Sequence, residues 1–230
     1  MTVHSSHRRI LVFDVNETLL DIEVLQPFFA RVFGDAIAMR QWFAELILYS
    51  QALSLSRDYT EFGTLAVAVL RMVAEIRNVL LTPADVDEFA ATMRALPPHR
   101  EVPEALAQLA DAGFRMVTLT NSASEAGKSV LDNAGLSHYF ERQFSVDEVR
   151  RFKPGREVYA HVATALAVEP ARLRLIAAHT WDTLGAIAAG YAAALVTRPG
   201  NAPLSVGGQP DIVARDLAAV ADRIIATDTE

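Results

Sequence analysis

The sequence predicts an α/β protein with a doubly wound, mostly parallel sheet and an all-helical segment inserted after the first strand. Short apolar runs rich in β-branched residues alternate with helical segments, and each run ends in a polar cluster, as buried parallel strands do. From about residue 20 to about residue 97 this alternation gives way to consecutive helical segments. We therefore assign residues 1–19 and 98–230 to an α/β core domain and residues 20–97 to a helical cap domain.

The apolar runs give the expected strands of the core. Each is short, and polar residues follow it directly, so function is expected at the carboxyl ends of the strands. The runs are Ile10–Val15, Arg115–Thr120, Arg174–Ala178 and Ala192–Thr197, with Asp211–Val213 as a short fifth.

Two local signals place helices between these strands. Pro103–Ala112 has its apolar residues at helical spacing, and Gly113 follows at the position where a helix commonly ends. Ser122 and Glu125 form a capping-box pattern, which predicts that a helix opens directly after the second strand.

The insert reads as four helices. Thr82 and Pro83 are a start signal, with a capping hydroxyl and a proline at the first helical position, and Leu96–His99 ends the block. Such a cap can cover a site at the strand ends and exclude water from it. The predicted helices are Val24–Phe33, Met39–Ser54, Glu61–Val79 and Pro83–Ala95.

Composition limits the partners of the chain. Its 230 residues carry a net charge of −7, which argues against a nucleic-acid binder. There is no cysteine, so disulfides and thiolate metal sites are excluded. Residues 1–9 are polar and give no targeting segment, and no apolar run approaches the roughly 20 residues of a membrane span. We expect a cytoplasmic enzyme without membrane partners.

Polar clusters that could carry chemistry follow the expected strands. Alone, each has a structural explanation as a turn, a helix cap or an exposed side chain. Together they offer a nucleophilic carboxylate, groups that hold an anion, and an ammonium that can pair with the carboxylate. The clusters centre on Asp14, on Thr120 and Asn121, on Lys153, and on His179 and Asp182.

In this order the clusters resemble the motifs of the haloacid dehalogenase superfamily, and within it the L-2-haloacid dehalogenase (type II) branch. The resemblance runs from Ile10 to about Leu217, and it implies a Rossmann-like core with a cap inserted between the first two motifs. Motif one is Asp14 through Thr18, motif two is Thr120-Asn121, motif three is Lys153-Pro154, and motif four ends in Trp181-Asp182.

The resemblance implies a role for each matching residue. Asp14 is the expected nucleophile, and Thr18, Lys153, Tyr159 and Asp182 are expected to support it. Arg40 matches the cap arginine that accepts the departing halide. The remaining expected binding residues are Thr120, Asn121 and Asn16, with Gln41, Phe62 and Trp181 lining the leaving-group pocket or belonging to the core.

Motif four departs from the branch. The family serine is Ala177 here, and the family asparagine is His179. We hypothesise that His179 takes over part of the water-positioning role, as a general base, since imidazole titrates near neutral pH. The alternative is that His179 only hydrogen-bonds Asp14 or lines the pocket.

The residue types favour a dehalogenase over the magnesium-dependent phosphatases of the superfamily. Those enzymes carry a second aspartate where this chain has Asn16, and an amide cannot deliver a proton to a leaving alkoxide. Ala177 and Ala178 stand where a second motif-four carboxylate would help to hold Mg²⁺. The resemblance therefore implies catalysis without a metal or cofactor.

We predict that the chain hydrolyses small (S)-2-haloalkanoic acids to 2-hydroxy acids through an aspartyl ester, releasing halide. Three alternatives stay open: a magnesium-dependent small-molecule phosphatase, a C–N hydrolase acting on a strained ring with a 2-carboxylate, and a binding protein that kept the fold. The resemblance also suggests a homodimer formed through cap helices.

Overall fold

The protein was analysed as a computed structural model, which describes residues 8–228. Within them lies one parallel sheet with the strand order β3-β2-β1-β4-β5-β6. This arrangement confirms the predicted doubly wound α/β class. The strands are β1 Ile10–Phe13, β2 Met116–Thr120, β3 Arg142–Ser145, β4 Leu173–Ala177, β5 Ala192–Val196 and β6 Ile212–Ala214.

The five predicted strands are all present, with ends shifted by one or two residues. Strand β3 was missed by the sequence prediction because its residues, Arg142–Ser145, form no apolar run. It lies at the edge of the sheet, where Arg142 is exposed and only the last two residues are buried. An edge strand needs no continuous apolar stretch.

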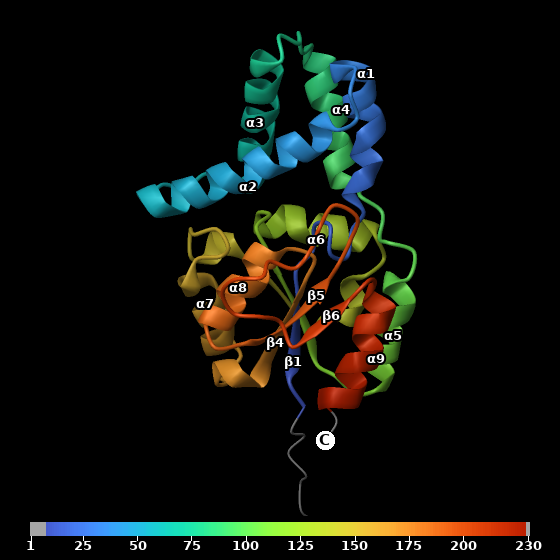
Figure 1. The fold of residues 1–230 in the computed structure, drawn as a ribbon, viewed down its shortest axis with the longest axis vertical. Coiled ribbons are helices and arrows are strands. Elements are labelled where there is room, and N and C mark those ends of the chain that lie inside the picture. Colours follow the sequence, from blue (N-terminus) through green and yellow to red (C-terminus); the bar gives the residue numbers. More distant parts are fainter. Residues whose placement is uncertain (1–7, 229–230) are drawn as a thin grey trace, which may run out of the picture.

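Helices cover both faces of the sheet. Helices α5 (Val102–Asp111) and α9 (Leu217–Asp228) pack together on one face, and α7 (Arg156–Ala165) and α8 (Thr180–Ala188) pack together on the other (Figure 1). Helix α5 ends just before Gly113, whose φ of 80° is the left-handed conformation that glycine adopts readily, as predicted.

Helix α6, Ser124–Asn133, begins one residue later than the capping pattern predicted. The predicted capping box of Ser122 and Glu125 is wrong, because Ala123 occupies the cap position and makes no side-chain hydrogen bond there. The Ser122 hydroxyl instead accepts a hydrogen bond from the Asn16 amide at 3.3 Å. A hydrogen bond between segments far apart in the chain thus takes the place of the predicted helix cap.

Four helices form a separate block beyond the carboxyl end of the sheet (Figure 1). Their core is aromatic: Phe28, Phe29, Trp42 and Phe89 pack against one another, and all four are buried. The predicted Thr82 cap is present as a full capping box with Asp85. After the 3-10 turn Ile22–Leu25, the helices are α1 Gln26–Phe33, α2 Ala38–Ser56, α3 Phe62–Ile76 and α4 Pro83–Arg94.

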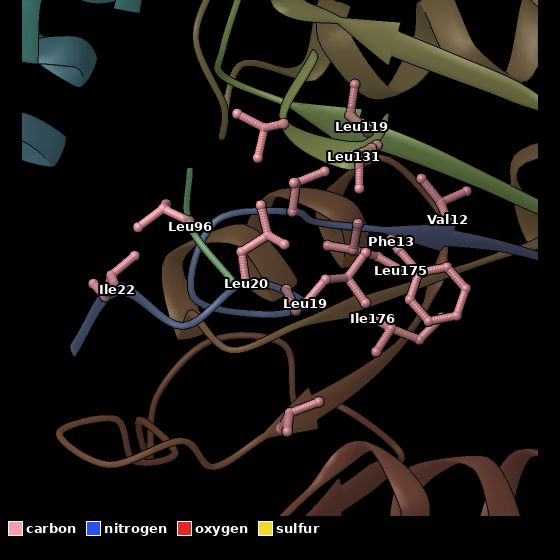
Figure 2. Close-up of a cluster of buried hydrophobic side chains, with 14 of the residues drawn as sticks. Val12, Phe13, Leu19, Leu20, Ile22, Leu96, Leu119, Leu131, Leu175 and Ile176 are labelled. Atoms are coloured by element: carbon pink, nitrogen blue, oxygen red, sulfur yellow. The ribbon is translucent and has the colours of Figure 1, made fainter. Parts of the chain in front are cut away.

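The chain enters and leaves this block at one place. Leu20 and Pro98 pair in an antiparallel bridge, and the Leu19 carbonyl accepts a hydrogen bond from the backbone of His99 at 2.9 Å. Figure 2 shows Leu19 and Leu20 packed between the strand residues of the core and Leu96 at the other crossing. These contacts support our proposed division into a core (1–19 and 98–230) and a cap (20–97).

The sequence analysis expected no targeting segment at the start of the chain and no membrane span elsewhere. Residues 1–7, which hold most of the segment judged to carry no targeting signal, lie outside the described residues. Within residues 8–228, none of the helices combines the length and apolar character that a membrane crossing requires.

A buried ion cluster joins the start of β4 to the last helix. Arg174 is fully buried, and its guanidinium binds Asp228 at 2.7 Å and Asp211 at 2.9 Å. A buried cation of this kind depends on its partners, because removing one leaves an uncompensated charge away from water.

Replacing Asp228 by alanine should therefore lower the free energy of unfolding by about 3 kcal/mol or more. The matched control is Asp222→Ala on the exposed side of the same helix, which should cost no more than about 1 kcal/mol. Urea unfolding followed by circular dichroism measures both. Equal losses for the two variants would show that the buried cluster is not a stabilising contact.

Candidate active site

Asp14 follows β1 directly and lies at the centre of the sheet's carboxyl edge. Its side chain is buried, and both carboxylate oxygens accept hydrogen bonds. Lys153 Nζ donates to Oδ1 at 2.7 Å, and the Thr18 hydroxyl donates to Oδ2 at 2.6 Å. Thr18 is itself fixed, because the backbone N–H of Ala178 donates to its oxygen at 2.8 Å. The carboxylate therefore has one orientation.

Lys153 is fully buried, and its ammonium group has an acceptor for each of its three hydrogens. Besides Asp14, Nζ donates to Asp182 Oδ2 at 2.6 Å and to the Leu119 carbonyl at 3.1 Å. The backbone N–H of Lys153 donates to the side-chain oxygen of Asn121 at 3.0 Å. Motifs one, two, three and four thus meet at this one residue.

Burial by itself would raise the pKa of the Asp14 carboxyl. The charges and hydrogen bonds of Lys153 and His179 outweigh burial, so the pKa of Asp14 lies well below its usual range. Asp14 is therefore ionised at neutral pH. An ionised carboxylate whose oxygens face a shielded site is suited to attack carbon.

Asp182 has a different role in the same cluster. Burial, together with the nearby charge of Asp14, raises the pKa of Asp182 although Lys153 acts against this. The Tyr159 hydroxyl donates to Asp182 Oδ1 at 2.6 Å, and burial and the Asp182 charge raise the pKa of Tyr159 well above 10.0. Tyr159 therefore stays protonated and holds Asp182 in place for Lys153.

His179 lies on the other side of the nucleophile. Its Nδ1 is 3.4 Å from Asp14 Oδ2, and its Nε2 is 2.7 Å from Glu17 Oε2. The ring stacks on Trp181 with ring centres 5.0 Å apart. Burial alone would lower the pKa of His179, but the two carboxylates outweigh it and raise the pKa to about 9. His179 is thus an imidazolium between two carboxylates in the resting protein.

Glu17 is a candidate site residue that the sequence analysis did not single out. It is buried, and it pairs with both His179 and Arg40. Its φ of 64° is in the left-handed region, which costs a non-glycine residue about 1–2 kcal/mol. Strain of this kind persists where the surrounding structure fixes the residue, and often where function needs it. The sequence does contain a signal for this pair: motif one includes an acid, and motif four includes a histidine.

The structure brings the other predicted catalytic residues, and Trp181, together around Asp14. These are Thr18, Lys153, Tyr159, His179, Trp181 and Asp182.

The remaining predicted residues lie farther out or hold other partners. Arg40 binds Glu17 and Glu23 and donates to the Pro199 carbonyl at 2.8 Å, so its guanidinium is held by carboxylates. Gln41 accepts a hydrogen bond from Arg77 at 2.8 Å within the cap.

On the core side, the Thr120 hydroxyl accepts from the backbone of Ser122 at 3.1 Å. Asn16 and Phe62 line a neighbouring pocket.

The donor set does not suit the divalent cation that phosphatases of this superfamily use. The carboxylates of Asp14 and Asp182 already share the ammonium of Lys153, and the Asn16 amide donates to Ser122. Among residues 8–228, no group of three or more acidic or histidine side chains has the arrangement of a metal site.

A parallel α/β sheet with an ionised, lysine-paired aspartate at its central carboxyl edge offers a carboxylate nucleophile at the place where such sheets bind their ligands. Residues 9–190 match a family model described as "haloacid dehalogenase-like hydrolase". The chain belongs to this family, as the motif resemblance predicted.

Two individual relatives are similar to the chain over nearly its whole length. The chain is 28% identical to (S)-2-haloacid dehalogenase 2 of Pseudomonas sp. (strain CBS-3), over 91% of this chain and 92% of the relative. It is 26% identical to an (S)-2-haloacid dehalogenase of Pseudomonas sp. (strain YL), over 92% of each chain.

Among solved structures, the L-2-haloacid dehalogenase of Xanthobacter autotrophicus superposes with a TM-score of 0.87 at 23% identity, covering 96% of this chain and 99% of that one. This likeness confirms the fold.

The two carboxylates around His179 lead to a first prediction about the site. Replacing Glu17 by glutamine removes one negative charge, so the pKa of His179 should fall from about 9 toward the ordinary value near 6.5. Imidazole chemical shifts followed by NMR between pH 5 and 10 measure the midpoint. Glu75→Gln, on the exposed side of α3, is the control and should leave the midpoint in place.

The same pKa sets a pH dependence of stability. Because folding raises the pKa of His179, its protonation stabilises the folded state fully below about pH 6.5, and this contribution is lost as the pH rises through about 9. The stability difference between the wild type and His179→Asn should therefore shrink over this range. A difference that stays constant from pH 6 to pH 10 would contradict the proposed charge on His179.

Proposed function

We propose that this protein hydrolyses the carbon–halogen bond of small (S)-2-haloalkanoic acids and releases a 2-hydroxy acid and halide. The observation that carries the proposal is the buried 2.7 Å contact between Asp14 and Lys153, combined with an amide at Asn16 where a phosphatase needs an acid. The similarity to named (S)-2-haloacid dehalogenases supports the same substrate class. One of the similar solved structures, from Xanthobacter autotrophicus, carries covalently bound chloropropionic acid.

In the first half-reaction, a carboxylate oxygen of Asp14 attacks C2 of the substrate from the face opposite the halogen. The oxygen–carbon bond forms as the carbon–halogen bond breaks, and the halide leaves with the bonding electrons. Thr18 and Lys153 hold the carboxylate in line for this approach, which needs close alignment of the reacting atoms. The configuration at C2 is inverted.

The substrate carboxylate and the departing halide need donors. Asn121 accepts from the backbone of Lys153 through its oxygen, so its NH₂ group is the proposed donor to the halide. Backbone N–H groups beside Thr120 are proposed to hold the substrate carboxylate. Arg40 remains a predicted halide ligand. That role requires its guanidinium to exchange Glu17 and Glu23 for the anion.

In the second half-reaction, water attacks the ester carbon of Asp14. Ester formation removes the charge of Asp14, which is one of the two carboxylates that keep His179 protonated. The pKa of His179 then falls, so the ring releases one proton to solvent and becomes neutral, while Glu17 holds Nε2. The neutral ring accepts the proton of the attacking water through Nδ1. As the acyl carbon–oxygen bond breaks, that proton passes to the leaving 2-oxygen, which gives the 2-hydroxy acid and restores the Asp14 carboxylate. In this proposal Glu17 and His179 replace the family's serine and asparagine as the water-activating pair.

The assembly and location of the protein are further proposals. Helix α2 exposes apolar side chains, with Leu55 86% and Leu48 56% accessible, which supports a homodimer formed through the cap. The cytoplasm stays the proposed location. The proposed partners are otherwise the haloacid and halide alone.

The proposed reaction predicts halide release from 2-chloropropionate that is unchanged by a chelator. In a single turnover in ¹⁸O-labelled water, the label should enter the Asp14 carboxylate, because water attacks the ester at that carbon. Mass spectrometry of the peptide containing Asp14 measures the label, and Asp14→Asn is the inactive control. Mg²⁺-dependent phosphate release from an aryl phosphate, without halide release, would support the phosphatase instead.

The proposed base predicts a separate effect. His179→Asn should slow ester hydrolysis by about 10²- to 10⁴-fold, so that the alkylated Asp14 peptide accumulates and can be seen by mass spectrometry. His138→Asn, at an exposed position, is the matched control and should turn over without accumulation. Normal ester hydrolysis in His179→Asn would leave the ring with a positioning role only.

A further inference from the structure

A pocket of about 520 Å³ lies between the cap and the core, and the catalytic cluster does not fill it. Its walls come from α3 and α4 of the cap and from α6 of the core. The volume is in the usual range for a small-molecule site. Besides the halogen and the carboxylate, C2 of chloroacetate or 2-chloropropionate carries only hydrogens or a hydrogen and a methyl group, so these substrates have no group that could fill a volume of this size.

The pocket adjoins the active site. Asn16 and Ser122 line it, and they are joined by the hydrogen bond of 3.3 Å between their side chains. Asn16 is two residues after the nucleophile, and Ser122 follows Asn121 directly. Asp14 itself is only 4% exposed, so a reacting carbon must approach it from an adjoining space.

The lining is chemically simple. Phe62 and Phe89 contribute aromatic surface, and alanines at positions 66, 90 and 126 leave room between the helices. Gly63 also faces open space, because a Cβ placed there would meet no heavy atom within 4 Å. Charged side chains reach the lining only at Glu61 and Arg94, which are both exposed. An apolar wall of small residues fits a hydrocarbon group.

We infer that this pocket holds the C2 substituent of the substrate, and that the preferred substrates are 2-haloacids with a medium-length alkyl or aryl group. The inference rests on the proposed function. For a substrate with its carboxylate at the strand ends and C2 in front of Asp14, the space between α3, α4 and α6, beside Asn16 and Ser122, is the adjoining room for the third substituent. Burial of each added methylene there favours binding by up to about fourfold.

A series of (S)-2-chloroalkanoates from propionate to octanoate tests the inference. We expect kcat/KM to rise with chain length by about two- to fourfold per methylene until the pocket is full. A second measurement is independent of turnover: titration calorimetry should show that 2-hydroxyoctanoate binds more tightly than 2-hydroxypropionate. A flat profile in both measurements would overturn the inference.

Variants that fill the pocket test whether this space is what selects for chain length. Ala90→Leu in α4 and Gly63→Leu in α3 add bulk from two walls, and each should lower the octanoate-to-propionate ratio of kcat/KM by about tenfold or more. Four lost methylene contacts are enough for such a change. Ala91→Leu, on the exposed side of α4, is the matched control and should leave the ratio and the activity unchanged.

The outcomes separate the inference from the proposed function. Equal losses for short and long substrates in Ala90→Leu would make the space an entry path and overturn the inference. Absence of halide release from every substrate would reject the proposed function. In that case calorimetry with the two hydroxy acids, on the wild type and Ala90→Leu, still decides whether the pocket binds the chain.

Discussion

The ammonium group of Lys153 neutralises the two carboxylates around which the rest of the site is arranged. It bridges Asp14 at 2.7 Å and Asp182 at 2.6 Å, and none of the three side chains could be buried in this form without the others. Burial strengthens the attraction by excluding water, and the attraction keeps Asp14 ionised against the effect of burial. Strand β1, the loop before α7 and the start of α8 are therefore held together by charge as well as by packing.

A second ionic chain extends from the other side of the nucleophile. His179 contacts Asp14 and Glu17, and Glu17 contacts Arg40 of the cap helix α2. This chain connects the core, where the carboxylate is fixed, to the cap, which supplies two walls of the apolar pocket. The proposed attack, the proposed water activation and the inferred chain-length preference thus depend on three adjoining regions with different chemistry: a cation–carboxylate cluster, a histidine between two acids, and a hydrocarbon wall.

Much of the fold could be predicted from the sequence because buried parallel strands and amphipathic helices leave local patterns. The edge strand Arg142–Ser145 left none, since only its last two residues are buried. For the site, residue types identified Asp14, Lys153 and Asp182. The partners of Ser122 and Arg40, and the role of Glu17, could not be read locally, because they depend on contacts between segments far apart in the chain.

The left-handed backbone at Glu17 carries a local cost that the contacts of its carboxylate outweigh. A glycine would adopt a φ of 64° without the strain of about 1–2 kcal/mol that a side chain adds there. The same change would delete the carboxylate that holds His179 and Arg40, and it would leave the buried imidazolium with one partner fewer, which is the larger loss. An acid therefore stands where the backbone alone favours glycine, so this position is occupied for its contacts across the site and not for the turn that it forms.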